Sequence, residues 1–284
     1  MNLMYLQCTR EALIACIVRL FEKFGLTEKF KLEARLQNWV RDLAAHYNPV
    51  IFHNLAHAFN VLHLSSVMWS RIQHQNYFDD VDLLVLFVGT ISHDLDHRGL
   101  GNTYFVKRKH PWAQTVSGQS VMENYHLHMA NLLIDKHGLF HALSPEETSR
   151  AKKTLTEMIL ATDLTKHFKI QSEFEMKIGK FDQKKQEDKD HFLAVIVHAC
   201  DIANSALPFD HFRSWGVRIV QELEDCFQAE LLLPDADKYP PAPFLAYKDK
   251  KGFYETQIGF AGYFIAPLLG AMKREWPELA FLHD

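Results

Sequence analysis

The sequence predicts an all-α protein, and three observations support this fold class. Apolar residues recur at helical spacing along most of the 284 residues. Alternating runs of Val, Ile and Thr bounded by turn residues, which are typical of β-strands, are nearly absent. No internal repeat or low-complexity linker interrupts the pattern. Hydrophobic residues make up 48% of the chain, which is enough to bury one large core or two small ones.

The expected helices follow one another with few breaks. Residues 9–24 and 31–47 each place apolar side chains on one face, and residues 55–73 form another long candidate. Ser144 and Glu147 form a capping box before a helix that Pro145 opens. The last candidates are a buried helix over 191–207, an amphipathic helix over 212–232 and a further helix that begins at QIGF. Between these last two lies 233–255, rich in Pro, Lys and Asp, which we expect to be a long surface loop.

The charge and cysteine content narrow the class of protein. A net charge of -4 and a pI of about 6.5 argue against a protein that holds a nucleic acid polymer through its phosphates, but not against one nucleotide in a pocket. The four cysteines form no CxxC pair, and charged residues interrupt every apolar run before it reaches a membrane-spanning length. We expect a cytoplasmic chain, with any membrane association arising from parts outside it.

Two histidines in FHNLAHAFNVLH are the first candidate for chemistry. His53 and His57 are four residues apart, so a helix would place them on one face, a turn apart. Such a pair is a reasonable half-site for a transition metal. The alternative is two ordinary histidines of the core or surface, since the chain contains 17.

The second candidate, ISHDLDHRG, follows the apolar run VDLLVLFVGT. His93 and Asp94 are adjacent, and His97 comes four residues after His93. Imidazole beside carboxylate suits Zn²⁺, Mn²⁺ or Fe²⁺. The alternative is a capping Asp in a solvated charge cluster, which the preceding apolar run disfavours because buried charge requires a partner or a metal.

Asp201 supplies the third candidate, because it interrupts the apolar helix expected over 191–207. Alone it would pair with a group on a neighbouring helix. Together the three segments predict a metal site with mixed nitrogen and oxygen ligands and open positions for water, which is typical of catalytic sites.

Four motifs in this order, HNxxHAxxV, HDxDHxG, ATDxxKH and QIGF, resemble the catalytic domain of class I 3′,5′-cyclic-nucleotide phosphodiesterases, within the HD-type metal phosphohydrolases. The resemblance covers about residues 9–272. It implies a compact helical domain over 1–284 with two metals in a deep pocket, cut from a larger protein with regulatory domains.

The resemblance also implies roles for individual residues. The ligands of a tightly held Zn²⁺ would be His57, His93, Asp94 and Asp201, with Asp94 also bridging to Mg²⁺ or Mn²⁺. His53 would be the general acid. His97 would lie behind the ligands, and the positions that hold metal-bound water would be Glu123, Thr162 and Asp163. The substrate positions would be Asn204, Ile219, Gln257 and Phe260, with the purine between Ile219 and Phe260.

These roles imply hydrolysis of the 3′-phosphoester of a cyclic nucleotide to the 5′-monophosphate by a hydroxide shared between two cations, with His53 protonating the leaving group. Asn204 favours cAMP, whereas Ser205 and Gly216 depart from the family pattern and leave room for cGMP or both. Arg98 departs too, since the family usually has Pro there. The alternatives are a phosphohydrolase acting on another nucleotide and a catalytically weak module that binds cyclic nucleotide.

Overall fold

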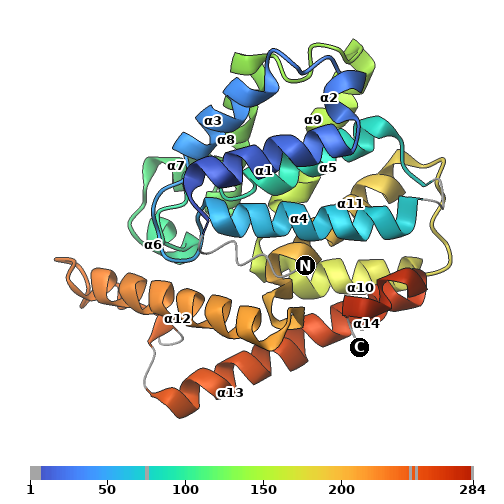
Figure 1. Ribbon diagram of the computed structural model, residues 1–284. Coiled ribbons are helices and arrows are strands. Elements are labelled where there is room, and N and C mark those ends of the chain that lie inside the picture. The colour runs from blue at the N-terminus through green and yellow to red at the C-terminus, as the bar shows by residue number, and fades with distance from the viewer. Residues whose placement is uncertain (1–7, 74–76, 243–244, 247–248, 283–284) are drawn as a thin grey trace.

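The computed structural model describes residues 8–73, 77–242, 245–246 and 249–282, and this part of the chain is helical without any β-strand. The predicted all-α class is therefore confirmed (Figure 1). No helix in the described part is both long enough and apolar enough to cross a membrane.

The helices vary from single turns to 23 residues. In the first half they are α1 (Arg10–Lys23), α2 (Leu26–Lys29), α3 (Leu36–Ala45), α4 (Leu55–Ile72), α5 (Asp80–Ser92), α6 (Asn102–Lys107), α7 (Pro111–Thr115) and α8 (Val121–His137). In the second half they are α9 (Pro145–Leu160), α10 (His167–Lys177), α11 (Gln186–Ile202), α12 (Phe209–Leu231), α13 (Lys250–Phe260) and α14 (Ala266–Glu275). Shorter turns are η3 (Leu164–Lys166), η4 (Ala203–Ala206), the π-helical η6 (Ala261–Ile265) and η7 (Pro277–Leu282).

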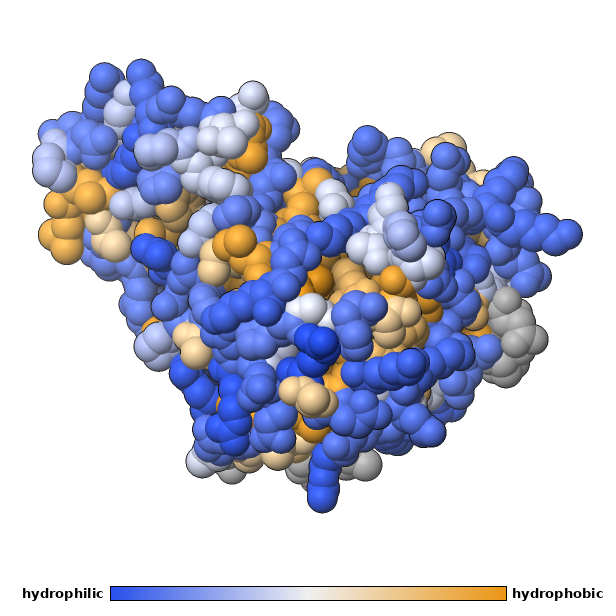
Figure 2. Space-filling view, turned by 90° about the horizontal axis from the view of Figure 1, so that it is seen from above, coloured by the Kyte–Doolittle hydropathy of each residue, from blue (hydrophilic) through white to orange (hydrophobic). Residues whose placement is uncertain are grey.

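Four helices form the centre of the molecule: α4, α5, α9 and α11 pack against one another. Helices α1, α3 and α8 cover one side of them, while α12 and α13 extend next to each other at the bottom of Figure 1. Figure 2 shows that hydrophilic side chains cover most of the face seen from above, with hydrophobic ones visible in the hollow at its middle and at its left edge. The central helices therefore carry the core, and their ends are available for polar groups.

Helix α5 shows how the sequence brings polar groups into the interior. Its residues Val81–Ser92 are all buried. Asp79 and Asp82 form a capping box at its start, where acidic groups also interact favourably with the helix dipole. The helix then runs through the core and delivers His93 and Asp94 at its far end.

Three expected boundaries were wrong. The helix expected over 31–47 begins only at Leu36, because Lys31 takes a left-handed φ of 53° that ends the preceding turn. The loop expected over 233–255 ends earlier, because Asp249 caps α13 by accepting from Gly252 N (2.7 Å). The helix expected from QIGF onward is interrupted by the π-helical turn η6.

The capping box at Ser144 and Glu147 is confirmed, since each side chain accepts a hydrogen bond from the other residue's backbone N–H. The buried helix expected over 191–207 is confirmed over 191–202, which belong to α11. It gives way to η4 at Ala203.

Candidate metal centre

Three helices bring together the four residues expected to bind a metal. His57 lies in the first turn of α4, His93 and Asp94 at the end of α5, and Asp201 near the end of α11. His57 Nε2 lies 2.9 Å from Asp201 Oδ1 and 3.4 Å from Asp94 Oδ2. His93 Nε2 lies 3.2 Å from each of the same two carboxylate oxygens. One ligand atom from each residue lies within 4.8 Å of the others, so the group could hold one ion.

The donor atoms fit a cation. His93 Nδ1 lies 2.8 Å from Thr90 O and donates its proton there, so in the neutral ring Nε2 is a lone-pair acceptor. That lone pair faces the oxygens of Asp94 and Asp201, and Asp94 Oδ2 has no hydrogen-bond partner among the described residues. Acceptors facing one another in a buried site require a positive charge between them.

The electrostatics of the group lead to the same conclusion. Burial disfavours a charged imidazole, but the carboxylates of Asp94 and Asp201 outweigh it and raise the pKa of His93 well above 6.5. Burial likewise opposes ionisation of Asp94, but the neighbouring histidines, His93 foremost, lower the pKa of Asp94 well below its ordinary value. The two carboxylates therefore favour positive charge at this place, whether a proton on an imidazole or a cation.

His53 lies outside the helix that carries His57, so the expected shared helix was wrong. Asn54 has extended backbone and caps α4, accepting from the backbone N–H groups of Ala56 and His57. A helix begins after its capping residue, which leaves His53 on the preceding turn. The two rings still approach edge to face, with centroids 5.8 Å apart.

Glu222, from the distant helix α12, orients His53. One oxygen, Oε1, accepts from His53 Nδ1, while Oε2 accepts from the backbone N–H groups of Phe52 (2.6 Å) and His53 (3.2 Å). Burial opposes the protonated ring, but the hydrogen bond to Glu222 and nearby carboxylates raise the pKa of His53 to about 8. His53 therefore holds a proton at neutral pH, with Nδ1 committed to Glu222.

His97 supports His53 from the other side. The two rings stack with centroids 4.1 Å apart, and His97 Nδ1 accepts from Gly99 N (3.0 Å). Burial, followed by the nearby His53, lowers the pKa of His97 well below 6.5. The neutral ring of His97 therefore restricts the orientation of the protonated ring of His53.

Asp96 and Arg98, which had no expected chemistry, stabilise the turn after α5. Asp96 adopts a left-handed φ of 60° and accepts from Asn48 Nδ2 (2.7 Å) and Tyr125 OH (2.7 Å). Arg98 Nη2 lies 3.2 Å from Asp96 Oδ2. The arginine found in place of the usual proline therefore pairs with the carboxylate that holds this turn.

The three residues expected near metal-bound water already have protein partners. Thr162 donates its hydroxyl to Ile159 O (2.8 Å). Asp163 accepts from Ser120 Oγ (2.7 Å) and caps η3. Glu123 accepts from Asn102 Nδ2 (3.0 Å). Burial, followed by the charge of Asp163, raises the pKa of Glu123 to about 7.

Two of the expected substrate residues, Ile219 and Gln257, lie on or beside α12, the helix that contacts His57 and His53. Trp215 and Glu222 on α12 contact His57 and His53 respectively, and the spacing 215, 219, 222 places Ile219 on the same helix face. Gln257 from α13 lies so close to Gly216 that a Cβ there would be 2.8 Å from Gln257 Oε1.

Phe260 and Asn204 complete this set. Phe260 is one turn beyond Gln257 and half-buried. Asn204 Oδ1, in η4, accepts from Asn60 Nδ2 of α4 at 3.1 Å.

The sequence did not predict Glu222 as a partner of His53. The sequence nevertheless places Glu222 on the buried face of α12. That face is formed by residues at helical spacing: Trp215, Ile219, Glu222, Cys226 and Glu230. A carboxylate on the otherwise buried face of an amphipathic helix requires a partner.

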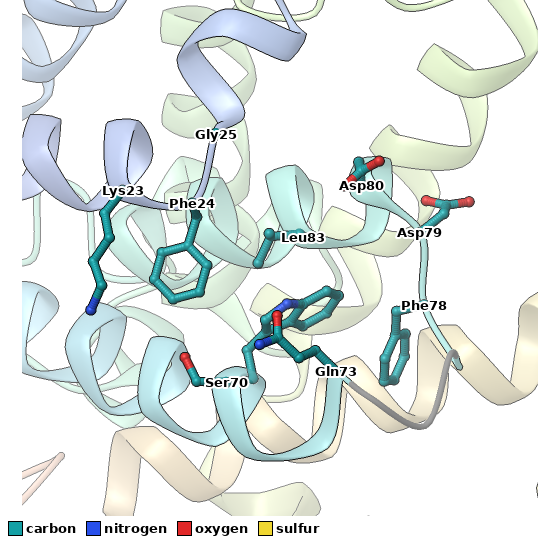
Figure 3. A pocket seen from close by; sticks show the side chains of 10 residues that line it. Lys23, Phe24, Gly25, Ser70, Gln73, Phe78, Asp79, Asp80 and Leu83 are labelled. Carbon is teal, nitrogen blue, oxygen red and sulfur yellow. The ribbon is translucent and has the colours of Figure 1, made fainter.

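A surface pocket of about 540 Å³ lies elsewhere, between the ends of α1 and α4 and the start of α5 (Figure 3). Phe24 and Leu83 point into it, whereas Asp79 and Asp80 point away. None of the expected site residues lines it.

Fold and site together define a class: a helical protein that gathers imidazoles and carboxylates at helix ends to hold a cation. The sequence profile described as 3′5′-cyclic nucleotide phosphodiesterase matches residues 52–284. The chain belongs to this family, whose members are metal-dependent.

Similar proteins agree with this assignment. The "cGMP-specific 3′,5′-cyclic phosphodiesterase" of Drosophila melanogaster is 28% identical over 273 residues, which cover 94% of this chain and 24% of that protein. The protein of the same name from Drosophila virilis is also 28% identical, and 30% of it is covered. The chain thus spans about a quarter of the length of such relatives.

Among solved structures, the phosphodiesterase domain of the RhoPDE fusion protein from the choanoflagellate Salpingoeca rosetta matches with a TM-score of 0.93 at 28% identity, covering all of this chain and 90% of that one. A second structure of the phosphodiesterase domain of this rhodopsin phosphodiesterase gives a TM-score of 0.92.

Proposed function

We propose that this chain hydrolyses the 3′-phosphoester bond of a purine 3′,5′-cyclic nucleotide to give the 5′-monophosphate. The observation that carries the proposal is the hydrogen bond between His53 and Glu222 beside the buried group of two histidines and two aspartates. A cation-binding group next to an acid is what hydrolysis of a phosphodiester with a poor alkoxide leaving group requires.

Asp94, Asp201, His57 and His93 would hold the tighter ion, for which Zn²⁺ suits the mixed ligand set, and Asp94 would share a second, Mg²⁺ or Mn²⁺. When bound, these ions supply positive charge for the phosphate oxygens and lower the pKa of water. Glu123, Thr162 and Asp163 would orient that water through their oxygens.

His53 would donate its proton to the departing O3′. Its Nδ1 is occupied by Glu222, so Nε2 is the nitrogen left to face a substrate. The neutral His97 ring beneath it would keep the imidazolium in plane without competing for the proton.

The base would lie between Ile219 and Phe260, with its edge against Gln257. An amide offers one donor and one acceptor, so Gln257 could match adenine or, after rotation, guanine. Because Asn204 Oδ1 is occupied by Asn60, its amide nitrogen would be free to donate to N7, which both purines carry.

We infer that both nucleotides are substrates. The preference for cAMP expected from Asn204 stays a prediction, and the names of the Drosophila relatives favour cGMP. Measuring kcat/KM for cAMP and for cGMP tests whether both are substrates. A ratio of the two kcat/KM values above about 100 in either direction would exclude dual use.

Two substitutions separate the proposed roles. His53→Ala should lower kcat by about 10²–10⁴ and leave the metal content unchanged. Asp201→Ala should instead lose bound metal, measured by elemental analysis after gel filtration. The reverse pattern, with metal lost from His53→Ala and retained by Asp201→Ala, would show that the roles are wrongly assigned.

We further propose that the chain acts in the cytoplasm as the catalytic part of a longer protein with regulatory domains. The length of the relatives supports this, because the chain covers only 24–30% of them. Localising the tagged full-length protein in cells tests whether it acts in the cytoplasm.

A further inference from the structure

Two buried histidines outside the metal centre form a hydrogen-bonded pair. His167, at the start of α10, places Nδ1 2.9 Å from Nε2 of His198 in α11. Neither side chain is exposed. Burial lowers the pKa of both, to about 4 for His198. Both rings are thus neutral near pH 7, so the N–H of one ring donates to the bare nitrogen of the other.

On one side, this pair supports the aromatic residues next to the proposed base site. Phe264 packs on the His167 ring with centroids 5.0 Å apart. Phe260 in turn stacks on Phe264, with centroids 4.9 Å apart and planes at 23°. Phe264 belongs to the π-helical turn η6, and such turns alter which way the following side chains face.

On the other side, the pair reaches the helix of the metal centre. His198 lies three residues before Asp201 on α11, so the two project from the same side of that helix. The negative charge of Asp201 partly counteracts the lowering of the His198 pKa by burial. A continuous series of contacts therefore runs from Phe260 through Phe264, His167 and His198 to the helix that carries Asp201.

We propose that the hydrogen bond between His167 and His198 sets the position of Phe260 relative to the metal centre, so that both histidines are positioning residues for the purine. This rests on the proposed function, in which Phe260 contacts the base. A directional bond between buried rings fixes the spacing of α10 and α11 more narrowly than apolar packing alone. Breaking it should weaken base binding and leave the chemistry at phosphorus intact.

The test uses variants that remove or keep the bond. His198→Leu and His167→Phe both lose it, and the second keeps a ring for Phe264 to rest on. His198→Gln places an amide nitrogen near the original Nε2 and should keep it. Phe264→Leu interrupts the contact at its other end. His191→Leu, two turns earlier on α11, is the matched control.

For cAMP and cGMP with Mg²⁺, the variants that lose the bond, and Phe264→Leu, should raise KM about tenfold while kcat stays within about threefold and metal content is unchanged. His198→Gln and the control should stay within about twofold of the wild-type KM. A merely structural role would lower the melting temperature of the variants without this split between KM and kcat.

Wild-type KM in both His167→Phe and Phe264→Leu would overturn the proposal, as would a fall in kcat that follows metal loss. If His198→Leu does not fold, the KM values of His167→Phe and Phe264→Leu still test the proposal. Failure of the proposed function looks different: the wild type would turn over neither nucleotide, or Phe260→Ala would leave KM unchanged.

Discussion

At the residue scale, the contact between His53 and Glu222 decides how the site could work. A histidine in water titrates near 6.5 and would be largely neutral at pH 7.5. The bond to Glu222 outweighs burial and raises the pKa to about 8. His53 is therefore mostly an acid at neutral pH, and it loses that form as the pH rises through about 8.

Glu222→Gln tests this link. Removing the negative charge should lower the pKa of His53, so the alkaline decline of kcat should move about one unit to lower pH. A pH profile from 6 to 10 measures the shift. Glu224→Gln on the same helix is the control, and an unmoved alkaline limb in Glu222→Gln would mean that Glu222 does not set the acidity of His53.

At the element scale, α5 carries two of the four proposed metal ligands. Ion pairs of Asp82 hold the start of this helix against α9 and α11. Asp82 is almost fully buried, accepts from Asp79 N (3.0 Å) and lies 3.4 Å from both Arg150 Nη1 of α9 and Lys189 Nζ of α11. Since α5 packs on α4 and α9, this anchor helps to fix where His93 and Asp94 emerge.

Asp82→Ala should lower the free energy of unfolding by about 1–3 kcal/mol, because it removes the capping-box bond to Asp79 N and leaves Lys189 without its carboxylate, while Arg150 keeps its pair with Asp79. Asp80→Ala, two residues away, removes only an exposed pair with Lys29 and should cost less than about 1 kcal/mol. Urea denaturation of both variants measures the difference. Equal losses would show that the anchor at Asp82 contributes nothing specific.

At the scale of the whole molecule, the metal group joins α4, α5 and α11 and should therefore stabilise the fold. Chelation should lower the melting temperature by about 5–10 °C, since removing an ion present at 100 times its Kd costs about 2.7 kcal/mol. Adding Zn²⁺ should restore it. In Asp201→Ala, neither chelation nor added Zn²⁺ should change the melting temperature. A shift as large as that of the wild type would show that the ion binds elsewhere.

The sequence predicted what local pattern controls. Helical spacing gave the all-α class and most helices. The three segments that carry these histidines and aspartates predicted a metal site, and the resemblance to the family named His57, His93, Asp94 and Asp201 as the ligands, which the structure brings together. It did not predict that His53 precedes the cap at Asn54, because Asn54 can equally continue a helix. Glu222 was missed because its contact with His53 spans 169 residues.

The central claim is tested most directly by hydrolysis of cAMP and cGMP with Mg²⁺ before and after chelation, with bound metal counted by elemental analysis. We expect turnover of both nucleotides to the 5′-monophosphate, loss of activity on chelation and recovery when Zn²⁺ and Mg²⁺ are returned. Protein that carries its metal and hydrolyses neither nucleotide would contradict the account.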